Sequence, residues 1–220
     1  MYVLCRRDNV HQISISDSLP SDQAQVEKMF ETTISKFGRM DVFVANAAVM
    51  KGGSITDTKG ENLQEHLDIN VRGSFRCCQL AARQLTKQGT DGKIIIISSI
   101  DGMWGNEGEI AYSMTKAALI LMMKCMAVEL GPRKINVNAI APGWVATDMS
   151  VPYLTGPLLK EVQKRVPLGY MAPPEQIAGG ALFLASPFSD YMSGHVMVMD
   201  GGQTANITIK AGEAPVVYST

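Results

Sequence analysis

Short apolar runs alternate with longer stretches of helical periodicity along most of this chain. The clearest run is residues 94–97, four isoleucines in succession, which is typical of a strand covered on both faces. Alternation of such runs with helices predicts a parallel sheet flanked by helices, a doubly wound α/β fold. Strands are expected at residues 42–45, 93–98, 135–140 and 195–199, with weaker candidates at 2–5 and 13–15.

Apolar residues at helical spacing predict the helices between these strands. Helices are expected at residues 22–37, 61–88, 109–130 and 174–186, with a mobile flap and a short helix at 149–166. The longest pattern is that of residues 61–88. Its regularly spaced apolar positions are Leu63, Leu67, Val71, Phe75 and Cys78.

The composition is that of an ordinary globular domain. The 220 residues, 46% of them apolar, suit a single domain (1–220) with a sizeable core. A net charge of −1 gives no electrostatic argument for nucleic acid or an anionic membrane as a partner. No apolar run approaches the ~20 residues of a membrane span, and the N-terminus lacks the pattern of a signal peptide.

Cysteine and histidine usage favours a cytoplasmic protein without a metal site. The four cysteines have no metal-ligand or redox spacing, so we expect reduced thiols. The three histidines are scattered and also lack metal-ligand spacing.

The segment 93–116 carries the candidate chemistry. A buried strand leads to Ser99, a glycine-rich loop follows, and a helix then places Tyr112 and Lys116 four residues apart on one face. A free phenol has a pKa near ~10 and is a poor acid–base catalyst at neutral pH. A nearby ammonium favours the phenolate, and a serine hydroxyl can bond the same substrate oxygen. This spacing predicts a proton-transfer site.

Several ordered motifs resemble those of the short-chain dehydrogenase/reductase family. Residues 41–48 (DVFVANAA) are similar to its fourth strand and Asn-Ala-Gly turn, with Ala48 where glycine is usual. The segment LDINVRGSF contains Asn70 at the position of the family's helix asparagine. Residues 135–147 (INVNAIAPGWVAT) and 199–202 (MDGG) match its later strands, so the resemblance runs from about residue 21 to 202.

The resemblance implies a role for each catalytic residue. Tyr112 would be the general acid that protonates a carbonyl, and Ser99 would orient that carbonyl. Lys116 would lower the pKa of the tyrosine and hold the nicotinamide ribose. Asn70 would anchor a proton-relay water.

The resemblance also implies a nicotinamide cofactor, NADP(H), and a small-molecule substrate. The residues expected at the cofactor are Asn46, Ala47, Tyr112, Lys116, Pro142, Gly143 and Thr147. Arg6 and Arg7 follow a short strand and would meet a 2′-phosphate, although a solvated basic pair is an alternative. Loops bordering the substrate cleft predict an apolar or aromatic substrate, or else packing of the flap on the core; their residues are Met103, Trp104, Val145, Met149 and Tyr153.

One family motif is missing from this chain. The family opens with a strand, a Thr-Gly-x-x-x-Gly-x-Gly turn and a helix, whose backbone N–H groups hold the dinucleotide pyrophosphate. Here no glycine precedes Gly38. We therefore expect a Rossmann-like fold that is incomplete at its N-terminal βα unit, with an atypical, shortened segment at 1–20. The tail at 203–220 shows no clear pattern. Gly102, Gly105 and Gly108 lie between Ser99 and Tyr112 and are expected to shape the substrate side.

Three functions stay open on these grounds. The first is a nicotinamide-dependent carbonyl reductase or alcohol dehydrogenase. The second keeps the Ser-Tyr-Lys chemistry without hydride transfer, as an isomerase, dehydratase or cyclase. The third is a catalytically silent subunit. In the family, the two long helices at 61–88 and 109–130 commonly build a homodimer or homotetramer.

Overall fold

The described residues form a six-stranded sheet in the strand order β2-β1-β3-β4-β5-β6. The computed structural model describes residues 2–7, 9–14, 22–150 and 156–205. Strands β3 to β6 run parallel, whereas β1 and β2 form an antiparallel hairpin, and β1 pairs antiparallel with β3. The strands are β1 (Tyr2–Arg7), β2 (Asn9–Ser14), β3 (Val42–Ala45), β4 (Gly92–Ile97), β5 (Ile135–Pro142) and β6 (Val196–Met199).

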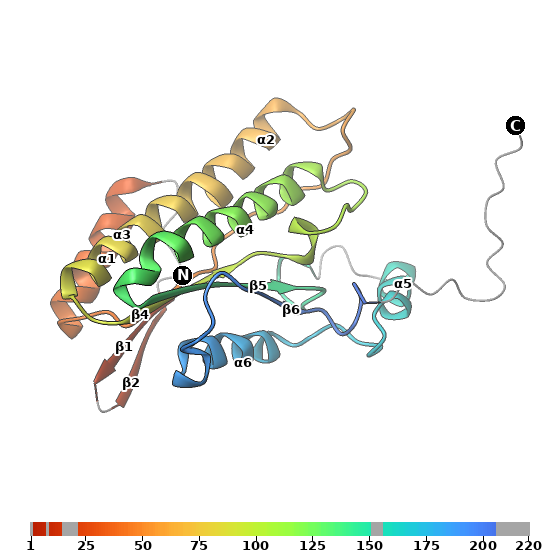
Figure 1. The fold of residues 1–220 in the computed structure, drawn as a ribbon. Helices are drawn as coiled ribbons and strands as arrows, with labels where there is room; N and C mark the ends of the chain where they lie inside the picture. The colour runs from red at the N-terminus through yellow and green to blue at the C-terminus, as the bar shows by residue number, and fades with distance from the viewer. Residues whose placement is uncertain (1, 8, 15–21, 151–155, 206–220) are drawn as a thin grey trace, which may run out of the picture.

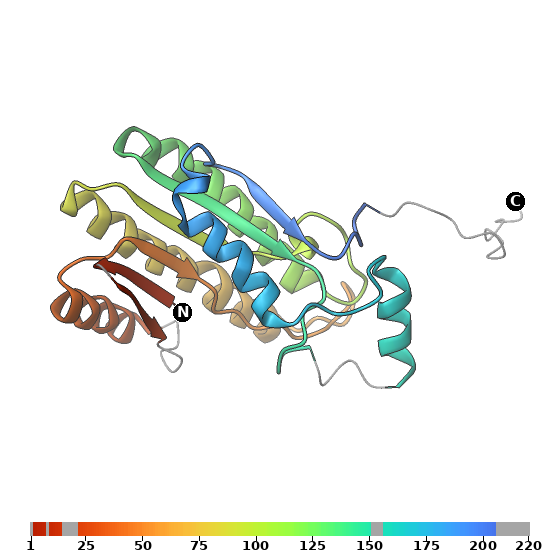
Figure 2. The same ribbon diagram turned by 90° about the horizontal axis from the view of Figure 1, so that it is seen from below.

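Helices cover both faces of this sheet (Figures 1 and 2). Helices α1, α3 and α4 lie on one face and α6 lies on the other. The α-helices are α1 (Gln23–Phe37), α2 (Gly60–His66), α3 (Ser74–Gln88), α4 (Ile110–Leu130), α5 (Pro157–Arg165) and α6 (Pro174–Ala185). A π-helical segment, η1 (Leu67–Gly73), joins α2 to α3, and short 3₁₀ turns occur at η2 (Ile100–Gly102), η3 (Gly131–Arg133) and η5 (Pro187–Ser189).

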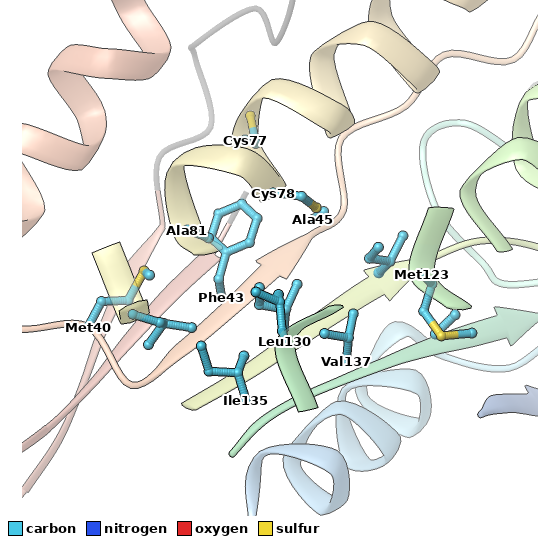
Figure 3. Packing of buried hydrophobic residues seen from close by; sticks show 14 of the residues in the cluster. Met40, Phe43, Ala45, Cys77, Cys78, Ala81, Met123, Leu130, Ile135 and Val137 are labelled. Carbon is cyan, nitrogen blue, oxygen red and sulfur yellow. The ribbon is translucent and has the colours of Figure 1, made fainter. Parts of the chain in front are cut away.

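Side-chain alternation along the central strands explains why both faces are buried. In β3, Phe43 belongs to the core under α1, α3 and α4, whereas Val42 and Val44 belong to the core under α6. In β4, Ile94 belongs to the core under α1, α3 and α4, and Ile95 belongs to the core under α6. Figure 3 shows the first of these cores. The fully apolar strand pattern therefore predicted the doubly wound architecture correctly.

The predicted helix at 61–88 is helical throughout, but its apolar face differs from the expectation. Phe75 is 52% exposed, whereas the inward positions of this segment include His66 and Asn70 as well as Cys77. Polar side chains with hydrogen-bond partners occupy part of the buried face. The positions of the apolar residues alone therefore do not identify that face. The outward Phe75 leaves an apolar surface on this helix.

The N-terminal strands do not build a parallel βα unit. The candidates at 2–5 and 13–15 become the hairpin of β1 and β2, whose register pairs Tyr2 with Ser14 and Arg7 with Asn9. Within the described residues, this hairpin takes the place at the sheet edge beyond β3 where a parallel strand was expected. The expectation of an incomplete first βα unit stays a prediction.

Helix α4 with the turn that follows it (Ile110–Arg133) is long and apolar enough to cross a membrane. This corrects the expectation that no segment of the chain is so. Length and composition alone are weak grounds for a membrane span, because the core helix of a soluble protein passes the same test. In α4, Leu119, Met123 and Leu130 are buried against the sheet.

Gly102 allows the loop after β4 to lie directly on α4. A Cβ atom at this position would lie 2.7 Å from the carbonyl carbon of Lys116 and 2.8 Å from its oxygen. These are backbone atoms, so a side chain at Gly102 would have to displace the loop from the helix. The glycine thus fixes the distance between the segment that carries Ser99 and the turn that carries Lys116.

We expect Gly102→Ala to lower the free energy of unfolding by ~1–3 kcal/mol, the usual cost of overpacking. Gly105→Ala is the matched control, because a Cβ there meets nothing within 4 Å and no positive φ is recorded at Gly105. Urea denaturation of both variants measures the difference. Equal stability of the two variants would show that the loop tolerates the methyl group.

Candidate active site

A cavity of about 1100 Å³ lies beyond the carboxyl ends of β3, β4 and β5, and most of the predicted site residues line it. In open α/β sheets, this is the edge at which ligands bind. The predicted residues that the structure brings together here are Asn46, Ala47, Ser99, Trp104, Tyr112, Lys116, Pro142, Gly143, Val145, Thr147 and Met149.

Ser99, Tyr112 and Lys116 come from two elements that pack on each other. Ser99 follows β4, and α4 carries Tyr112 and Lys116 on its buried face. The Nζ atom of Lys116 lies 5.5 Å from the centroid of the Tyr112 ring and donates a hydrogen bond of 2.9 Å to the carbonyl oxygen of Ile97. The Ser98 hydroxyl donates to the carbonyl oxygen of Lys116 at 2.8 Å, which fastens α4 to the end of β4.

Burial dominates the protonation of both titratable groups. Burial raises the pKa of Tyr112 above its ordinary value. The charge of Asp101, and more weakly that of Glu109, raises this pKa further, whereas a hydrogen bond with Ser99 lowers it. Burial lowers the pKa of Lys116 to about 8, which the charge of Asp101 partly opposes. The expected lowering of the tyrosine pKa is therefore not found in the protein alone, where the phenol is held protonated.

Asn70 lies behind the cavity and connects two elements of the site. Its side-chain oxygen accepts from the Val49 N–H at 2.8 Å, and its amide donates to the Val49 carbonyl and the Thr115 hydroxyl at 2.9 and 3.0 Å. Asn70 is 0% exposed and belongs to the π-helical segment η1, a form often found at functional sites. These bonds join the loop after β3 to α4. The anchoring of a relay water by Asn70 stays a prediction.

His66 is a buried neighbour of Tyr112 that the sequence did not reveal as part of the site. The Lys51 N–H donates to its Nε2 atom at 3.1 Å, so Nδ1 carries the ring proton and donates to the Asn62 carbonyl at 2.8 Å. The imidazole meets the Tyr112 ring edge to face, with the ring centroids 6.5 Å apart. His66 therefore packs the phenol while holding the loop after β3.

Two carboxylates near Tyr112 were also missed. Asp101 and Glu109 line the cavity together with Asn106, whose side chain lowers the pKa of both carboxyl groups against the larger effect of burial. The Ser99 hydroxyl donates to the Asp101 carboxylate at 3.0 Å, and the Asp101 N–H donates back to Ser99 at 3.1 Å. The signal in the sequence was a carboxylate two residues after Ser99, inside a loop that had been interpreted from its glycines.

Besides Asn70, three predicted residues that the structure describes, Met103, Arg6 and Arg7, are not brought to the cavity. Met103 is exposed and does not line it. Tyr153 lies outside the described residues. Because β1 runs antiparallel to β3, with Tyr2 beside Val44 and Leu4 beside Val42, the backbone of Arg6 and Arg7 extends past the start of β3, away from Asn46. This topology does not support the expected contact of these arginines with a cofactor phosphate.

The cavity fits one half of a nicotinamide dinucleotide. The Asn46 amide, the Tyr112 hydroxyl and the Lys116 ammonium line it together and suit a ring and a ribose. Packing alone accounts for a glycine at position 143, because a Cβ atom there would lie 2.8 Å from the Cβ of Asp200. For the pyrophosphate, the described residues before β3 offer no glycine-rich turn between a parallel strand and a helix. The nicotinamide riboside half therefore fits, and the described residues before β3 show no glycine-rich cradle for the diphosphate half.

Fold and site together define a doubly wound α/β protein with Ser99, Tyr112 and Lys116 on one cavity, and comparison with known proteins gives its family. The model of the family described as enoyl-(acyl carrier protein) reductase matches residues 20–204. An L-rhamnose-1-dehydrogenase of Scheffersomyces stipitis is 37% identical, over 91% of this chain and 77% of that protein. A 3-oxoacyl-[acyl-carrier-protein] reductase of Thermotoga maritima is 36% identical, over 83% and 73%.

A solved structure agrees with these relatives. The gluconate 5-dehydrogenase of Burkholderia cenocepacia, in complex with NADP and tartrate, superposes with a TM-score of 0.82 at 26% identity, covering 86% of this chain and 74% of that one. The chain belongs to the short-chain dehydrogenase/reductase family of NAD(P)-dependent oxidoreductases.

We expect Lys116→Met to stabilise the fold at pH 7, because it removes a buried ammonium. The pKa of Lys116 falls from 10.5 to about 8 on folding, so burial of the charge costs on the order of 3 kcal/mol below pH 8. The lost bond to Ile97 offsets about 1 kcal/mol of the gain.

The pH dependence gives the sharper test of this prediction. The penalty declines as pH rises from about 8, where the folded protein loses the proton, toward 10.5, where the unfolded chain loses it as well. The advantage of Lys116→Met should thus shrink between pH 7 and pH 10 in denaturant titrations. Lys28→Met, at an exposed position of α1, is the control and should show no such trend. A pH-independent difference would contradict burial of the charged form.

Proposed function

We propose that this protein transfers hydride between NADP(H) and a small carbonyl compound or the corresponding alcohol. The observation that carries the proposal is the convergence of Ser99, Tyr112 and Lys116 on one cavity that also contains the Asn46 and Pro142–Gly143 turns. The bound nicotinamide supplies or accepts the hydride. The residues of this chain supply the proton and the positioning.

Tyr112 is the general acid when a carbonyl is reduced. Burial and the charge of Asp101 keep its hydroxyl protonated at neutral pH, so a proton is available for the carbonyl oxygen. The phenolate left behind faces the ammonium of Lys116, whose pKa of about 8 leaves it mostly charged at pH 7. The ammonium therefore stabilises the phenolate at the moment it forms, and solvent returns the proton afterwards.

Ser99 positions the reacting oxygen, and its hydrogen bonds determine how it does so. Its hydroxyl donates to Asp101 at 3.0 Å. A substrate carbonyl next to Tyr112 would compete with Asp101 for this proton. Substrate binding thus exchanges one acceptor of the Ser99 hydroxyl for another.

The affinity for the cofactor depends on hydrogen bonds to its phosphates. A bond from a backbone N–H to a phosphate contributes ~1.5–3 kcal/mol, so the loss of two or three such bonds would reduce affinity by orders of magnitude. The similarity to an NADP-bound gluconate dehydrogenase and to two other oxidoreductases supports the cofactor all the same. A non-redox isomerase, dehydratase or cyclase that uses the same three residues is the alternative outcome.

A fluorescence titration with NADPH and NADH tests the proposal, with Tyr112→Phe as the matched variant. We expect NADPH to bind, and we expect Tyr112→Phe to reduce carbonyl turnover by ~10²–10⁴-fold, the usual contribution of a general acid. Cofactor affinity should change little, because the ring remains. The absence of nicotinamide binding, together with Tyr112-dependent turnover that needs no cofactor, would replace the proposal with the non-redox alternative. A protein with neither nicotinamide binding nor Tyr112-dependent turnover would support the third function, a catalytically silent subunit.

We also propose that the protein is a cytoplasmic homodimer or homotetramer that pairs through α3 and α4. On α4, Met114, Leu121 and Val128 recur every seven residues on the outward face, with Leu121 64% and Val128 80% exposed. Phe75 adds an exposed ring on the neighbouring α3. A second copy of the chain is the occupant that suits this face, because two such helix pairs would cover each other's apolar residues.

Leu121→Arg is expected to shift the protein from dimer or tetramer to monomer, because a guanidinium would be desolvated in the paired helices. Sedimentation velocity measures the assembly, and circular dichroism checks that the fold is retained. Ile55→Arg, which replaces an exposed apolar residue in the loop before α2, is the control and should leave assembly unchanged. A monomeric wild-type protein would contradict the proposed assembly.

A further inference from the structure

The substrate end of the cavity contains a polar network that the redox chemistry does not require. The Ser99 hydroxyl donates to the Asp101 carboxylate at 3.0 Å, and the Asn106 side chain lies near enough to Asp101 and Glu109 to lower the pKa of both carboxyl groups. All four residues line the same cavity as Tyr112. The acceptor oxygens of Asp101 therefore lie one hydrogen bond away from the hydroxyl that positions the reacting oxygen.

The two carboxylates retain capacity to accept further hydrogen bonds. An ionised carboxylate has about four acceptor positions, and the contacts with Ser99 and Asn106 use only part of them. Burial raises the pKa of both groups, which marks them as partly removed from water. Among the described residues, neither carboxylate forms an ion pair with a basic side chain. A bound molecule that donates hydrogen bonds would satisfy them.

The charged groups of the cavity limit the charge that a bound molecule can carry. An anionic group would face Asp101 and Glu109, and a cationic group would approach the Lys116 ammonium in the same cavity. A neutral hydroxyl can donate to a carboxylate without either repulsion. Trp104, 57% exposed, adds an aromatic face at this end of the cavity, suited to the carbon skeleton of such a compound.

We propose that Asp101, supported by Asn106 and Glu109, selects neutral substrates that carry a hydroxyl on the carbon next to the reacting carbon. The inference rests on the proposed redox function and names its substrate class. The neighbouring oxygens of an α-hydroxy ketone or a vicinal diol lie about one hydrogen-bond length apart. When one oxygen is bound by Ser99 and Tyr112, the other therefore comes within reach of Asp101. This proposal differs from the apolar or aromatic substrate expected from the sequence.

The inference can be tested with cyclohexanone and 2-hydroxycyclohexanone, two ketones that differ in one hydroxyl group. With NADPH we expect a 10–100-fold higher kcat/KM for the hydroxyketone, the usual effect of a hydrogen bond to a charged group. Asp101→Ala should bring the ratio of the two kcat/KM values close to one. The ratio isolates recognition, because any effect of Asp101 on Ser99 or Tyr112 changes both substrates alike. Glu107→Gln, at an exposed carboxylate outside the cavity, is the control and should keep the wild-type ratio.

A binding measurement keeps the inference testable if no nicotinamide-dependent turnover occurs. Both tryptophans of the chain, Trp104 and Trp144, line the cavity, so their fluorescence reports its occupancy. We expect cis-1,2-cyclohexanediol to bind at least tenfold more tightly than cyclohexanol, and Asp101→Ala to remove that difference. A wild-type protein that does not distinguish the members of either pair would overturn the inference. A proportional loss for both ketones in Asp101→Ala would likewise overturn it and make Asp101 a positioning residue for Ser99.

Discussion

The buried ammonium of Lys116 is the constraint on which the rest of the site depends. A charge that is only 2% exposed is costly, and its 2.9 Å bond to the Ile97 carbonyl ties it to the last residue of β4. The Ser98 hydroxyl and the bare backbone of Gly102 then hold the same turn of α4 against β4. These contacts fix Tyr112 beside Ser99, so packing around one lysine determines the geometry of the proton-transfer site.

The site combines groups that oppose one another electrostatically. Burial and the Asp101 carboxylate hold the phenol of Tyr112 protonated, whereas in the proposed mechanism the Lys116 ammonium, 5.5 Å from the centroid of the phenol ring, stabilises the phenolate. The balance suits a group that must give up a proton only when the substrate oxygen gains negative charge. Asp101 couples this balance to recognition, because the same carboxylate accepts the hydrogen bond of Ser99.

Much of the fold could be predicted from the sequence, and the exceptions have physical reasons. Strand β3 has the predicted bounds, because unbroken apolar strands leave little ambiguity. The inward face of the 61–88 helix was not evident, because His66 and Asn70 occupy it through hydrogen bonds that periodicity cannot detect. Spacing found Ser99, Tyr112 and Lys116. Asp101 was missed, because the loop after Ser99 was interpreted from its glycines and not from the carboxylate two residues after the serine.

The register of the central strands has a consequence for how this protein can vary in length. Ala45 lies beside Ile96, and Ile97 beside Ile140, so the turns after β3, β4 and β5 reach the cavity together. Inserting one residue within any of these strands would move its last residue by ~3.3 Å and turn its side chains to the opposite layer. Insertions and deletions are therefore tolerated at the far ends of the strands and in the outer loops, but not between a strand and its catalytic turn.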